Sequence, residues 1–304
     1  MRIVVSGATG LIGRTVVDRL AGAGHRVLAL MRAVPRDTQL PRGVEPLETG
    51  DLVSFAGWPR ALDGADGLVH LAAIAHHSNL DERRLEEVNV LVAEKAARAA
   101  CVAKARFVFL STAKVHGEES SRSPFYASNA LTPQDVYART KAAAERALSG
   151  VAGLEWTILR PPLVYGPGVK ANFFALMRAI ARGWPLPFAS IENRRSLVYV
   201  GNLCDAIIRC LEAPQAAGRT YLVTDGAPVS TPQLCRALGD ALGCSARLFP
   251  FPASVLELHP GLRRLTRSLE VDDSAIRREL GWQPPYTFEE GLRLTAEWYR
   301  ARGG

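Results

Sequence analysis

Residues 2–13 read RIVVSGATGLIG, a short β-branched run followed by three glycines spaced three residues apart. The run predicts a buried strand, and the glycines lie where a loop opens into a helix. Gly7 permits a tight turn, Gly10 lets backbone amides approach a pyrophosphate, and Gly13 lets the helix pack on the strand. This unit predicts a dinucleotide site, the alternative being a glycine-rich turn without a ligand. The residues expected to line the site are Gly7, Thr9, Gly10, Leu11, Ile12 and Gly13.

Strand-like and helix-like segments alternate through the first half of the chain. Strands are expected at residues 2–6, 25–30, 44–48, 67–71, 106–111 and 154–160, and helices at residues 11–23, 80–103 and 133–148. Such alternation implies right-handed crossovers between parallel strands, and fully apolar strands fit a sheet that is covered on both faces. The predicted fold is α/β, a Rossmann-type doubly wound parallel sheet with a smaller C-terminal α/β substrate-binding lobe.

A change of pattern marks the boundary between these two parts. Prolines and glycines crowd into residues 161–168, and beyond them helices and short strands mix irregularly. We expect residues 1–167 to form the Rossmann domain, which the chain rejoins at about residues 197–228. Residues 168–304 are expected to form the substrate-binding lobe.

The composition is that of an ordinary globular protein. The 304 residues include 37 Lys and Arg against 30 Asp and Glu, a formal charge of +7, and 48% are apolar, which excludes a wholly disordered or coiled-coil chain. No apolar stretch approaches the roughly 20 residues of a membrane span, and the N-terminus lacks the features of a signal peptide. The five cysteines are scattered without metal-ligand spacing, so we expect a cytoplasmic protein without a metal site. Because the basic residues form no compact run, small phosphorylated ligands are expected rather than nucleic acid.

Further motifs resemble those of the extended short-chain dehydrogenases/reductases. The matching segments are Gly7–Gly13, Gly50–Leu52 (GDL), His70–Ala73 (HLAA), Tyr137–Lys141 (YARTK), Arg160–Gly168 (RPPLVYGPG) and Leu280–Pro284 (LGWQP). The resemblance covers nearly the whole chain and implies an NAD(P)-dependent enzyme from the group of nucleotide-sugar epimerases, dehydratases and ketoreductases. It also implies a homodimer, which alanine-rich faces at residues 92–103 and 142–147 would permit.

The end of the second strand bears on the choice of cofactor. NAD binding usually needs an acid there to accept from the ribose 2′-hydroxyl, but this chain has Met31 and then Arg32, with Arg36 nearby. A guanidinium in place of a carboxylate favours a 2′-phosphate. NADP(H) is therefore favoured, and NAD(H), with Arg32 stacked on the adenine, is the alternative. The resemblance implies further cofactor contacts at Asp51, Leu52, Leu71, Ala72, Ala73, Asn89, Tyr137, Lys141 and Pro161.

Tyr137 and Lys141 lie four residues apart in a helical segment and therefore share one face. A free phenol has a pKa of about 10, and a nearby ammonium lowers it, so we expect Tyr137 to exchange a proton with the substrate. The resemblance implies that Lys141 also holds the nicotinamide ribose. It implies that Thr112 hydrogen-bonds the reacting oxygen, whereas Ser111 is as readily a strand cap as a functional residue.

Lys114 and Arg195 are the charged residues expected at the substrate. The Lys114 ammonium either binds a hydroxyl or acetamide oxygen of a sugar or is solvated in a loop. Arg195 resembles a diphosphate-binding arginine, and its five-donor guanidinium suits a pyrophosphate. One of Arg263, Arg264 and Arg267 is a second candidate for the phosphates, and the sequence does not choose among them.

Asn172 follows the boundary at the position where relatives contact the nucleotide. Trp184 and Phe188 either pack on the nucleobase or belong to the core. His76, His77 and His116 have no spacing that would make them ligands and are expected in loops, the first two near the nicotinamide. The substrate contacts predicted in this way are Lys114, Asn172, Phe188 and Arg195.

The segment after the boundary bears on the reaction. Leu163 stands where an asparagine often meets the substrate of epimerases, and together with Met31–Arg32 this favours a reductase. The run from Gly168 to Asn202 resembles bacterial enzymes of surface-polysaccharide assembly that reduce a UDP-linked 4-keto-6-deoxy-N-acetylhexosamine. The alternative is a UDP-sugar 4-epimerase of the UDP-glucose or UDP-N-acetylglucosamine type with tightly held NAD. A non-catalytic NAD(P)-sensing regulator is a third hypothesis, against which the Tyr137–Lys141 pair stands.

Overall fold

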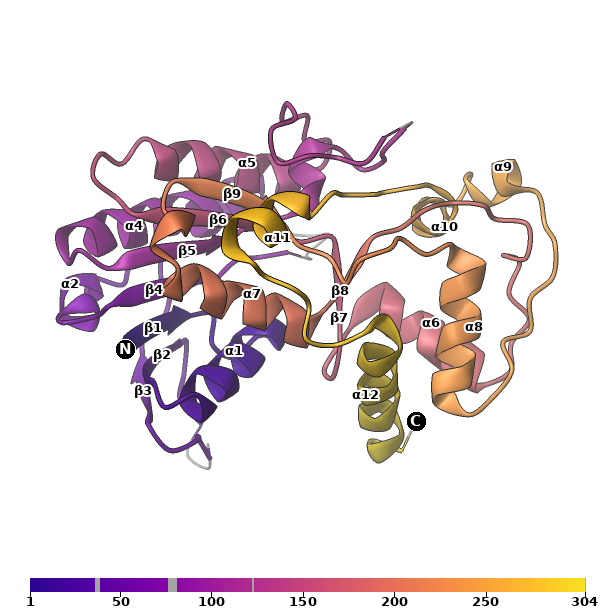
Figure 1. The fold of residues 1–304 in the computed structure, drawn as a ribbon, viewed down its shortest axis with the longest axis horizontal. Coiled ribbons are helices and arrows are strands. Elements are labelled where there is room, and N and C mark those ends of the chain that lie inside the picture. Colours follow the sequence, from indigo (N-terminus) through magenta and orange to yellow (C-terminus); the bar gives the residue numbers. More distant parts are fainter. Residues whose placement is uncertain (36–38, 76–80, 122, 304) are drawn as a thin grey trace.

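A seven-stranded parallel sheet forms one half of the molecule (Figure 1). The computed structural model describes residues 1–35, 39–75, 81–121 and 123–303. The strand order is β3-β2-β1-β4-β5-β6-β9, and every pairing is parallel. The strands are β1 (Arg2–Ser6), β2 (Arg26–Met31), β3 (Val44–Glu48), β4 (Gly67–His70), β5 (Arg106–Leu110), β6 (Trp156–Arg160) and β9 (Arg219–Leu222). The predicted Rossmann-type fold class is therefore confirmed.

Helices cover both faces of the sheet because alternate strand residues are apolar on both sides. In β1, Ile3 and Val5 join the core under α1 (Leu11–Gly22) and α7 (Val200–Glu212), whereas Val4 joins the core on the opposite face. That second face is covered by α2 (Trp58–Leu62), α4 (Val92–Val102) and α5 (Val136–Ser149). α11 (Ser274–Leu280) packs against β9.

The segment expected as one helix over residues 80–103 contains an irregularity. Within its described part, α3 (Glu82–Glu86) continues through a π-helical segment, η1 (Glu87–Leu91), into α4. The alanine-rich sides of α4 and α5 face the molecule's own core, and their buried members are Ala93, Ala96, Ala97, Ala100, Ala142 and Ala144. These alanines are covered within the chain and do not support the expected homodimer.

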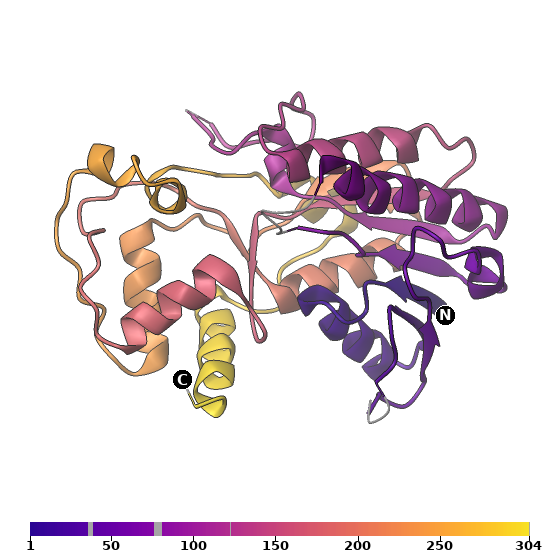
Figure 2. The ribbon, with the colours of Figure 1, turned by 180° about the vertical axis from the view of Figure 1, so that it is seen from behind.

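The other half of the molecule is built from a two-stranded parallel sheet and five helices (Figure 2). The two strands are β7 (Leu163–Tyr165) and β8 (Leu197–Tyr199), and α6 and α12 both pack against α8. Between β8 and α8 the chain returns to the large sheet through α7 and β9. The helices are α6 (Ala171–Ala181), α8 (Thr231–Leu242), α9 (Ala253–Leu256), α10 (Pro260–Thr266) and α12 (Phe288–Ala301).

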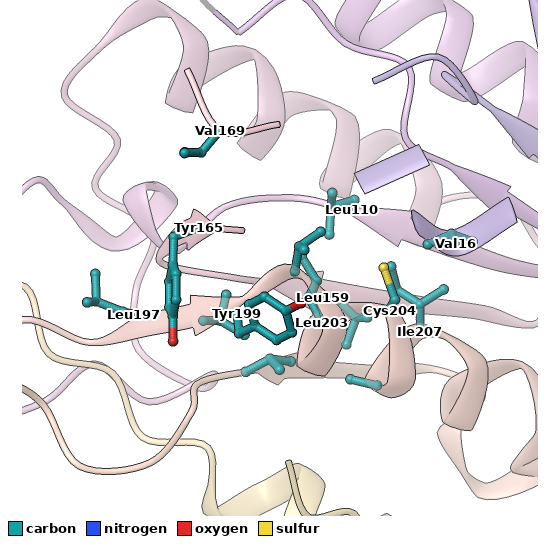
Figure 3. Close-up of a cluster of buried hydrophobic side chains, with 14 of the residues drawn as sticks. Val16, Leu110, Leu159, Tyr165, Val169, Leu197, Tyr199, Leu203, Cys204 and Ile207 are labelled. Atoms are coloured by element: carbon teal, nitrogen blue, oxygen red, sulfur yellow. The ribbon is translucent and has the colours of Figure 1, made fainter. Parts of the chain in front are cut away.

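One apolar cluster runs from the large sheet into the smaller lobe (Figure 3). Leu110 and Leu159 contribute from the ends of β5 and β6, and Leu203 contributes from α7. Tyr165 and Tyr199 extend the cluster from β7 and β8. A continuous core fixes the position of the lobe relative to the carboxyl ends of the strands.

The described part of the chain has no helix long and apolar enough to cross a membrane. It also has no cluster of three or more potential metal ligands. All five cysteines are free thiols.

Candidate active site

The loop after β1 is pressed against the loop after β4. Gly7 has a left-handed φ of +76°, and a Cβ there would lie 2.7 Å from the amide nitrogen of Ala72. A Cβ on Gly13 would lie 2.2 Å from the carbonyl oxygen of Gly7. Both positions exclude side chains, so the two loops and the start of α1 form a close backbone cradle.

The amino end of α1 is open to an anion. Its N-cap is Gly10, which offers no side-chain cap, and its first turn contains no acidic residue. The free backbone amides and the positive end of the helix dipole favour a phosphate there. This bare cradle fits the pyrophosphate of a dinucleotide, with Thr9, Leu11 and Ile12 in the same loop and turn.

Two arginines surround Asp51 beyond β2 and β3. Arg32 is exposed directly after the buried Met31, and Arg84 of α3 forms an ion pair with Asp51. The backbone amide of Val53 lowers the pKa of Asp51 most, and Arg84 and Arg32 lower it further. The sequence analysis missed Arg84, because no local pattern links it to a residue 33 positions away. Arg36 lies outside the described residues.

Asn89, a predicted cofactor contact, lies within η1 and is fully occupied by hydrogen bonds inside the chain. Its side-chain oxygen accepts a hydrogen bond from the amide of Ile74 at 2.8 Å. Its nitrogen donates to the Ile74 carbonyl at 3.1 Å and to Thr140 Oγ1 at 3.0 Å. Asn89 therefore fixes the loop after β4 against α5 instead of presenting a free donor to a cofactor.

The remaining predicted cofactor contacts lie on the loops that follow β3, β4 and β6. The Leu71 amide bonds the Ser6 carbonyl at 3.1 Å, and the Ala113 amide bonds the Pro161 carbonyl at 2.8 Å. The loops that follow β1, β4, β5 and β6 are thus tied together at the carboxyl edge of the sheet, where open α/β sheets bind ligands. The residues placed on these loops are Leu71, Ala72, Ala73 and Pro161, and the half-buried Leu52 follows β3.

Thr112, Tyr137 and Lys141 come from the end of β5 and the start of α5. Thr112 is 9% exposed, and its Oγ1 accepts from the Lys114 amide at 3.3 Å, which leaves its proton to donate. Neighbouring Ser111 has a buried hydroxyl with no partner among the described residues. The Tyr137 hydroxyl is likewise without a hydrogen bond to the described part of the chain, so it is available to a substrate.

The protein alone shifts the pKa of Tyr137 in the direction opposite to the prediction. Burial raises the pKa of the phenol above its usual value, and the carboxylate of Asp135 raises it further. Lys141 is 2% exposed with its ammonium 4.3 Å from the Phe109 ring centre, and burial lowers its pKa to about 7. A lowered pKa reduces the positive charge that Lys141 places near the phenol in the protein alone.

His70 is a buried polar residue to which the sequence analysis gave no role. It is fully buried at the end of β4, with Nδ1 2.9 Å from Ser6 Oγ, and its ring stacks on Phe107 and Phe109. Burial lowers its pKa to about 3, and Lys141 contributes to the shift. His70 is thus a neutral support beneath the ring on which Lys141 lies.

The burial of neutral His70 predicts a loss of stability in acid. The pKa of His70 is about 3 in the folded state and about 6.5 in the unfolded state. Between these pH values only the unfolded state binds the proton. Stability is complete above pH 6.5 and falls as the pH drops, by about 2 kcal/mol for this residue between pH 7 and pH 5. Urea unfolding of the wild type and His70→Phe at both pH values measures the difference. Equal pH dependence in the two proteins would contradict the assignment.

A buried ion pair joins α5 to β6. Arg160 donates to Glu145 through Nε at 3.0 Å and Nη2 at 2.6 Å, and both side chains are less than 10% exposed. Arg160 Nη1 also donates to the Ala127 carbonyl at 2.9 Å and lies 3.0 Å from His116 Nε2. The cluster ties α5 to the end of β6 and places His116 in a buried contact. His76 and His77 lie outside the described residues.

Arg195 reaches the region between the two lobes. Its Nη1 donates to the carbonyls of Arg264 and Arg267 at 2.6 and 3.1 Å. Burial lowers its pKa to about 10, so it remains protonated at neutral pH. Arg195 has no carboxylate partner in the described part of the chain, which leaves its charge free for an anionic ligand.

The three arginines of α10 and its end differ from Arg195, because each is paired with a glutamate. Arg264 pairs with Glu118, whereas Arg267 pairs with both Glu119 and Glu257. Arg263 also reaches Glu119. Together they line a cavity of about 310 Å³ between the loop after β5 and α9–α10.

The other predicted substrate contacts fall in different environments. Asn172 is exposed in the first turn of α6, whose amino end has no side-chain cap. Phe188 is 2% exposed and belongs to the core, one of the two interpretations that the sequence left open. Trp184 is 52% exposed, so it is not a core residue. Lys114 is not solvated as a loop lysine would be, because two carboxylates bind its ammonium.

Comparisons with known proteins find similar sequences and structures along nearly the whole chain. A family model described as the NAD dependent epimerase/dehydratase family matches residues 3–224. UDP-glucose 4-epimerase of Vibrio cholerae is 36% identical over 97% of this chain and 94% of its own. A 4-hydroxy-2-methyl-3-oxo-4-farnesyl-3,4-dihydroquinoline-1-oxide ketoreductase of Stigmatella aurantiaca is 28% identical over 96% of this chain and 95% of its own. The structure of DesIV, a dTDP-glucose 4,6-dehydratase of Streptomyces venezuelae with NAD bound, is 26% identical with a TM-score of 0.80, covering 100% of this chain and 98% of that one.

Proposed function

Because this chain belongs to the NAD-dependent epimerase/dehydratase family and is an NAD(P)-dependent enzyme of the extended short-chain dehydrogenase/reductase type, we propose that it reduces a nucleotide sugar. The proposed substrate is a UDP-4-keto-6-deoxy-N-acetylhexosamine, whose C4 ketone becomes a hydroxyl. The observation that carries this proposal is that α5, which bears Tyr137 and Lys141, packs against the turn that follows Thr112, while the Tyr137 hydroxyl has no hydrogen bond to the described part of the chain. The resemblance to surface-polysaccharide enzymes supports this substrate, and a cytoplasmic location follows from it.

The residues around the reacting carbonyl have distinct roles in this proposal. Thr112 donates a hydrogen bond to the carbonyl oxygen, and Tyr137 donates the proton that completes the hydroxyl. Lys141 holds the ribose of the cofactor and adds positive charge beside the phenol. The cradle of Gly7, Gly10 and Gly13 would hold the pyrophosphate. When bound, the nicotinamide supplies the hydride.

The substrate diphosphate is proposed to lie between the lobes. Arg195 is the primary candidate, because its guanidinium is charged, half-buried and without a carboxylate partner among the described residues. Asn172 at the uncapped start of α6 offers a second polar contact. Phe188 would contribute only through its backbone or by supporting the pocket wall, since its side chain is in the core.

Incubation of the protein with UDP-4-keto-6-deoxy-GlcNAc and NADPH tests the proposal. We expect loss of absorbance at 340 nm and a UDP-6-deoxy-HexNAc product, whose configuration at C4 NMR would establish. An unchanged NADPH signal under these conditions would rule out the proposed reduction.

A 4-epimerase is the second candidate, and the 36% identity to the Vibrio cholerae UDP-glucose 4-epimerase favours it. Such an enzyme would use Tyr137 and Thr112 to oxidise C4 and then reduce it from the other face. It would purify with stoichiometric NAD and interconvert UDP-glucose and UDP-galactose without added cofactor. That result would select epimerisation over reduction.

We propose NADP(H) as the preferred cofactor because Arg32 stands exposed where a ribose-binding acid would be expected. Arg32→Asp is expected to weaken NADPH binding by about 1.5–3 kcal/mol, roughly 10- to 150-fold, through loss of a charge-assisted contact and introduction of like-charge repulsion. NADH affinity should be unchanged or improved. Titration of cofactor fluorescence on the mutant and wild type measures both constants, and unchanged NADPH affinity would defeat the assignment.

A further inference from the structure

The Lys114 ammonium lies in a group of charges that the proposed reaction does not use. Its Nζ donates to Asp135 Oδ2 at 2.6 Å and to Glu118 Oε1 at 3.2 Å. The side chain is 27% exposed and stems from the short turn Ala113–His116 that follows Thr112. Lys114 thus links the turn that follows Thr112 to the start of α5, which carries Tyr137.

Asp135 is the N-cap of the catalytic helix α5. Its Oδ1 accepts from the Ala138 amide at 2.6 Å, and its Oδ2 accepts from Lys114. The two oxygens therefore have different tasks, one in capping the helix and one in binding the ammonium. Tyr137 lies between Asp135 and Ala138 in this first turn, so the cap fixes the backbone that carries the phenol.

We propose that Lys114 is a positioning residue for Tyr137, acting through Asp135. By neutralising the N-cap carboxylate, Lys114 removes a negative charge from beside the phenol and holds the turn after β5 against the start of α5. This inference rests on the proposed use of Tyr137 as the proton donor, and it replaces direct substrate contact as the role of Lys114.

Two other charged residues of α5 form ion pairs of their own. Arg139 lies 3.3 Å from Glu82 of α3, and Glu145 is held by Arg160 at the far end of the helix. Lys141, one turn along, has its ammonium against an aromatic ring.

Asp135 is the carboxylate that, next to burial, raises the pKa of the Tyr137 phenol. Removal of Lys114 would leave that carboxylate without its ammonium partner. The remaining charged groups on these elements are Arg83, Arg84, Glu86, Glu87, His116 and Arg146.

Glu118 extends the cluster toward the substrate lobe. It accepts from Lys114 and also pairs with Arg264 at 3.7 Å. The four groups Lys114, Arg264, Glu118 and Asp135 carry two positive and two negative charges, so the cluster as a whole is neutral. Because its net charge is zero, this cluster is not expected to attract the substrate diphosphate away from Arg195.

The test is a charge-balancing pair of substitutions assayed by steady-state kinetics. Lys114→Met keeps the length of the side chain but leaves Asp135 uncompensated, and we expect kcat to fall roughly three- to tenfold with KM nearly unchanged. Lys114→Met combined with Asp135→Asn removes both charges while the asparagine oxygen still caps Ala138, and we expect most of kcat to return. Lys104→Met, on the exposed Lys104 between α4 and β5, is the matched control and should retain wild-type kinetics.

A direct substrate contact predicts a different result. Lys114→Met would then raise KM, and Asp135→Asn would not restore activity, which would overturn the proposal. In the reductive direction, the fall in kcat at high pH marks deprotonation of Tyr137. This limb should move to higher pH in Lys114→Met and return in the double variant.

A second readout does not depend on the identity of the substrate. With tyrosine labelled with carbon-13 at Cζ and NADP+ bound, the Tyr137 resonance is assigned by its loss in Tyr137→Phe. Its titration should move upward by about one pH unit in Lys114→Met and return in the double variant. Coincident Tyr137 titration curves in the wild type and Lys114→Met would overturn the role of Lys114. Failure of the wild type to reduce the UDP-ketosugar would overturn only the proposed function.

Discussion

Tyr137→Phe is expected to lower kcat by about 10²- to 10⁴-fold, the usual contribution of a positioned acid or base. The substitution removes a hydroxyl that has no hydrogen-bond partner in the described part of the chain, so the fold loses nothing with it. Cofactor affinity should change by less than about threefold, because the Gly7–Gly13 cradle and Lys141 remain. Stopped-flow reduction with NADPH, together with a cofactor binding titration, measures both quantities.

Tyr221→Phe is the matched control for this experiment. Its hydroxyl donates to Glu279 at 3.0 Å on the β9 side of the molecule, so the same atom is deleted outside the proposed site. We expect kcat to be retained there. If Tyr137→Phe kept its activity, proton donation by Tyr137 would be wrong. Loss of turnover with cofactor binding retained would exclude the non-catalytic NAD(P)-sensing regulator.

Glu145→Gln is expected to destabilise the protein by about 3–5 kcal/mol, because it leaves the buried Arg160 guanidinium without its counter-charge. The two residues form a bidentate pair with side chains 4% and 7% exposed. The pair joins α5 to the end of β6, and its two residues are 15 positions apart in the sequence. Urea unfolding at pH 7 measures the change in the free energy of unfolding.

Glu297→Gln provides the comparison on the surface. Glu297 pairs with Arg293 one turn earlier in α12 at 2.6 Å, but the two side chains are about half exposed. Exposed pairs of this kind contribute about 0.3–0.5 kcal/mol. Similar small losses for the two substitutions would show that the Arg160–Glu145 pair is hydrated and does not hold α5.

The parallel sheet was predictable because it depends on local composition. Each predicted strand begins and ends within two residues of the observed one. Apart from β3, which contains two glutamates, the strands are mainly apolar runs bounded by glycine or charge, and such runs have few other solutions. The cradle at Gly7 and Gly13 was predictable for the same reason. The glycine spacing reflects close backbone contacts that leave no room for a Cβ, and the structure has these contacts at Gly7 and Gly13.

The charged part of the site was not predictable, because its partners are distant in sequence. Arg84 meets Asp51, Arg160 meets Glu145, and Lys114 meets Asp135 only after the sheet has formed. Composition gives the number of such charges but not their pairing. For Lys114 the two interpretations left open by the sequence, substrate contact or a solvated lysine, did not include pairing with the carboxylate that caps α5.

The π-helical segment was also beyond the reach of periodicity. Residues 87–91 have the composition of the surrounding helix. The extra residue in a π-helical turn changes only the angular position, about the helix axis, of the side chains that precede it. Asn89 lies in this segment and meets both Ile74 and Thr140. A pattern at a period of 3.6 residues predicts a uniform helix and cannot place such a side chain.

The return of the chain through α7 and β9 has a consequence for synthesis on the ribosome. A nascent chain of 167 residues has β6 as an open edge strand, and Val16 and Leu20 of α1 lack the α7 residues that cover them. β9 pairs with β6 only after residue 222 has been translated, and α11 follows near residue 280. The nucleotide-binding half is therefore completed late in translation, and its exposed edge and helix face make the interval before release the stage most open to aggregation and most dependent on chaperones.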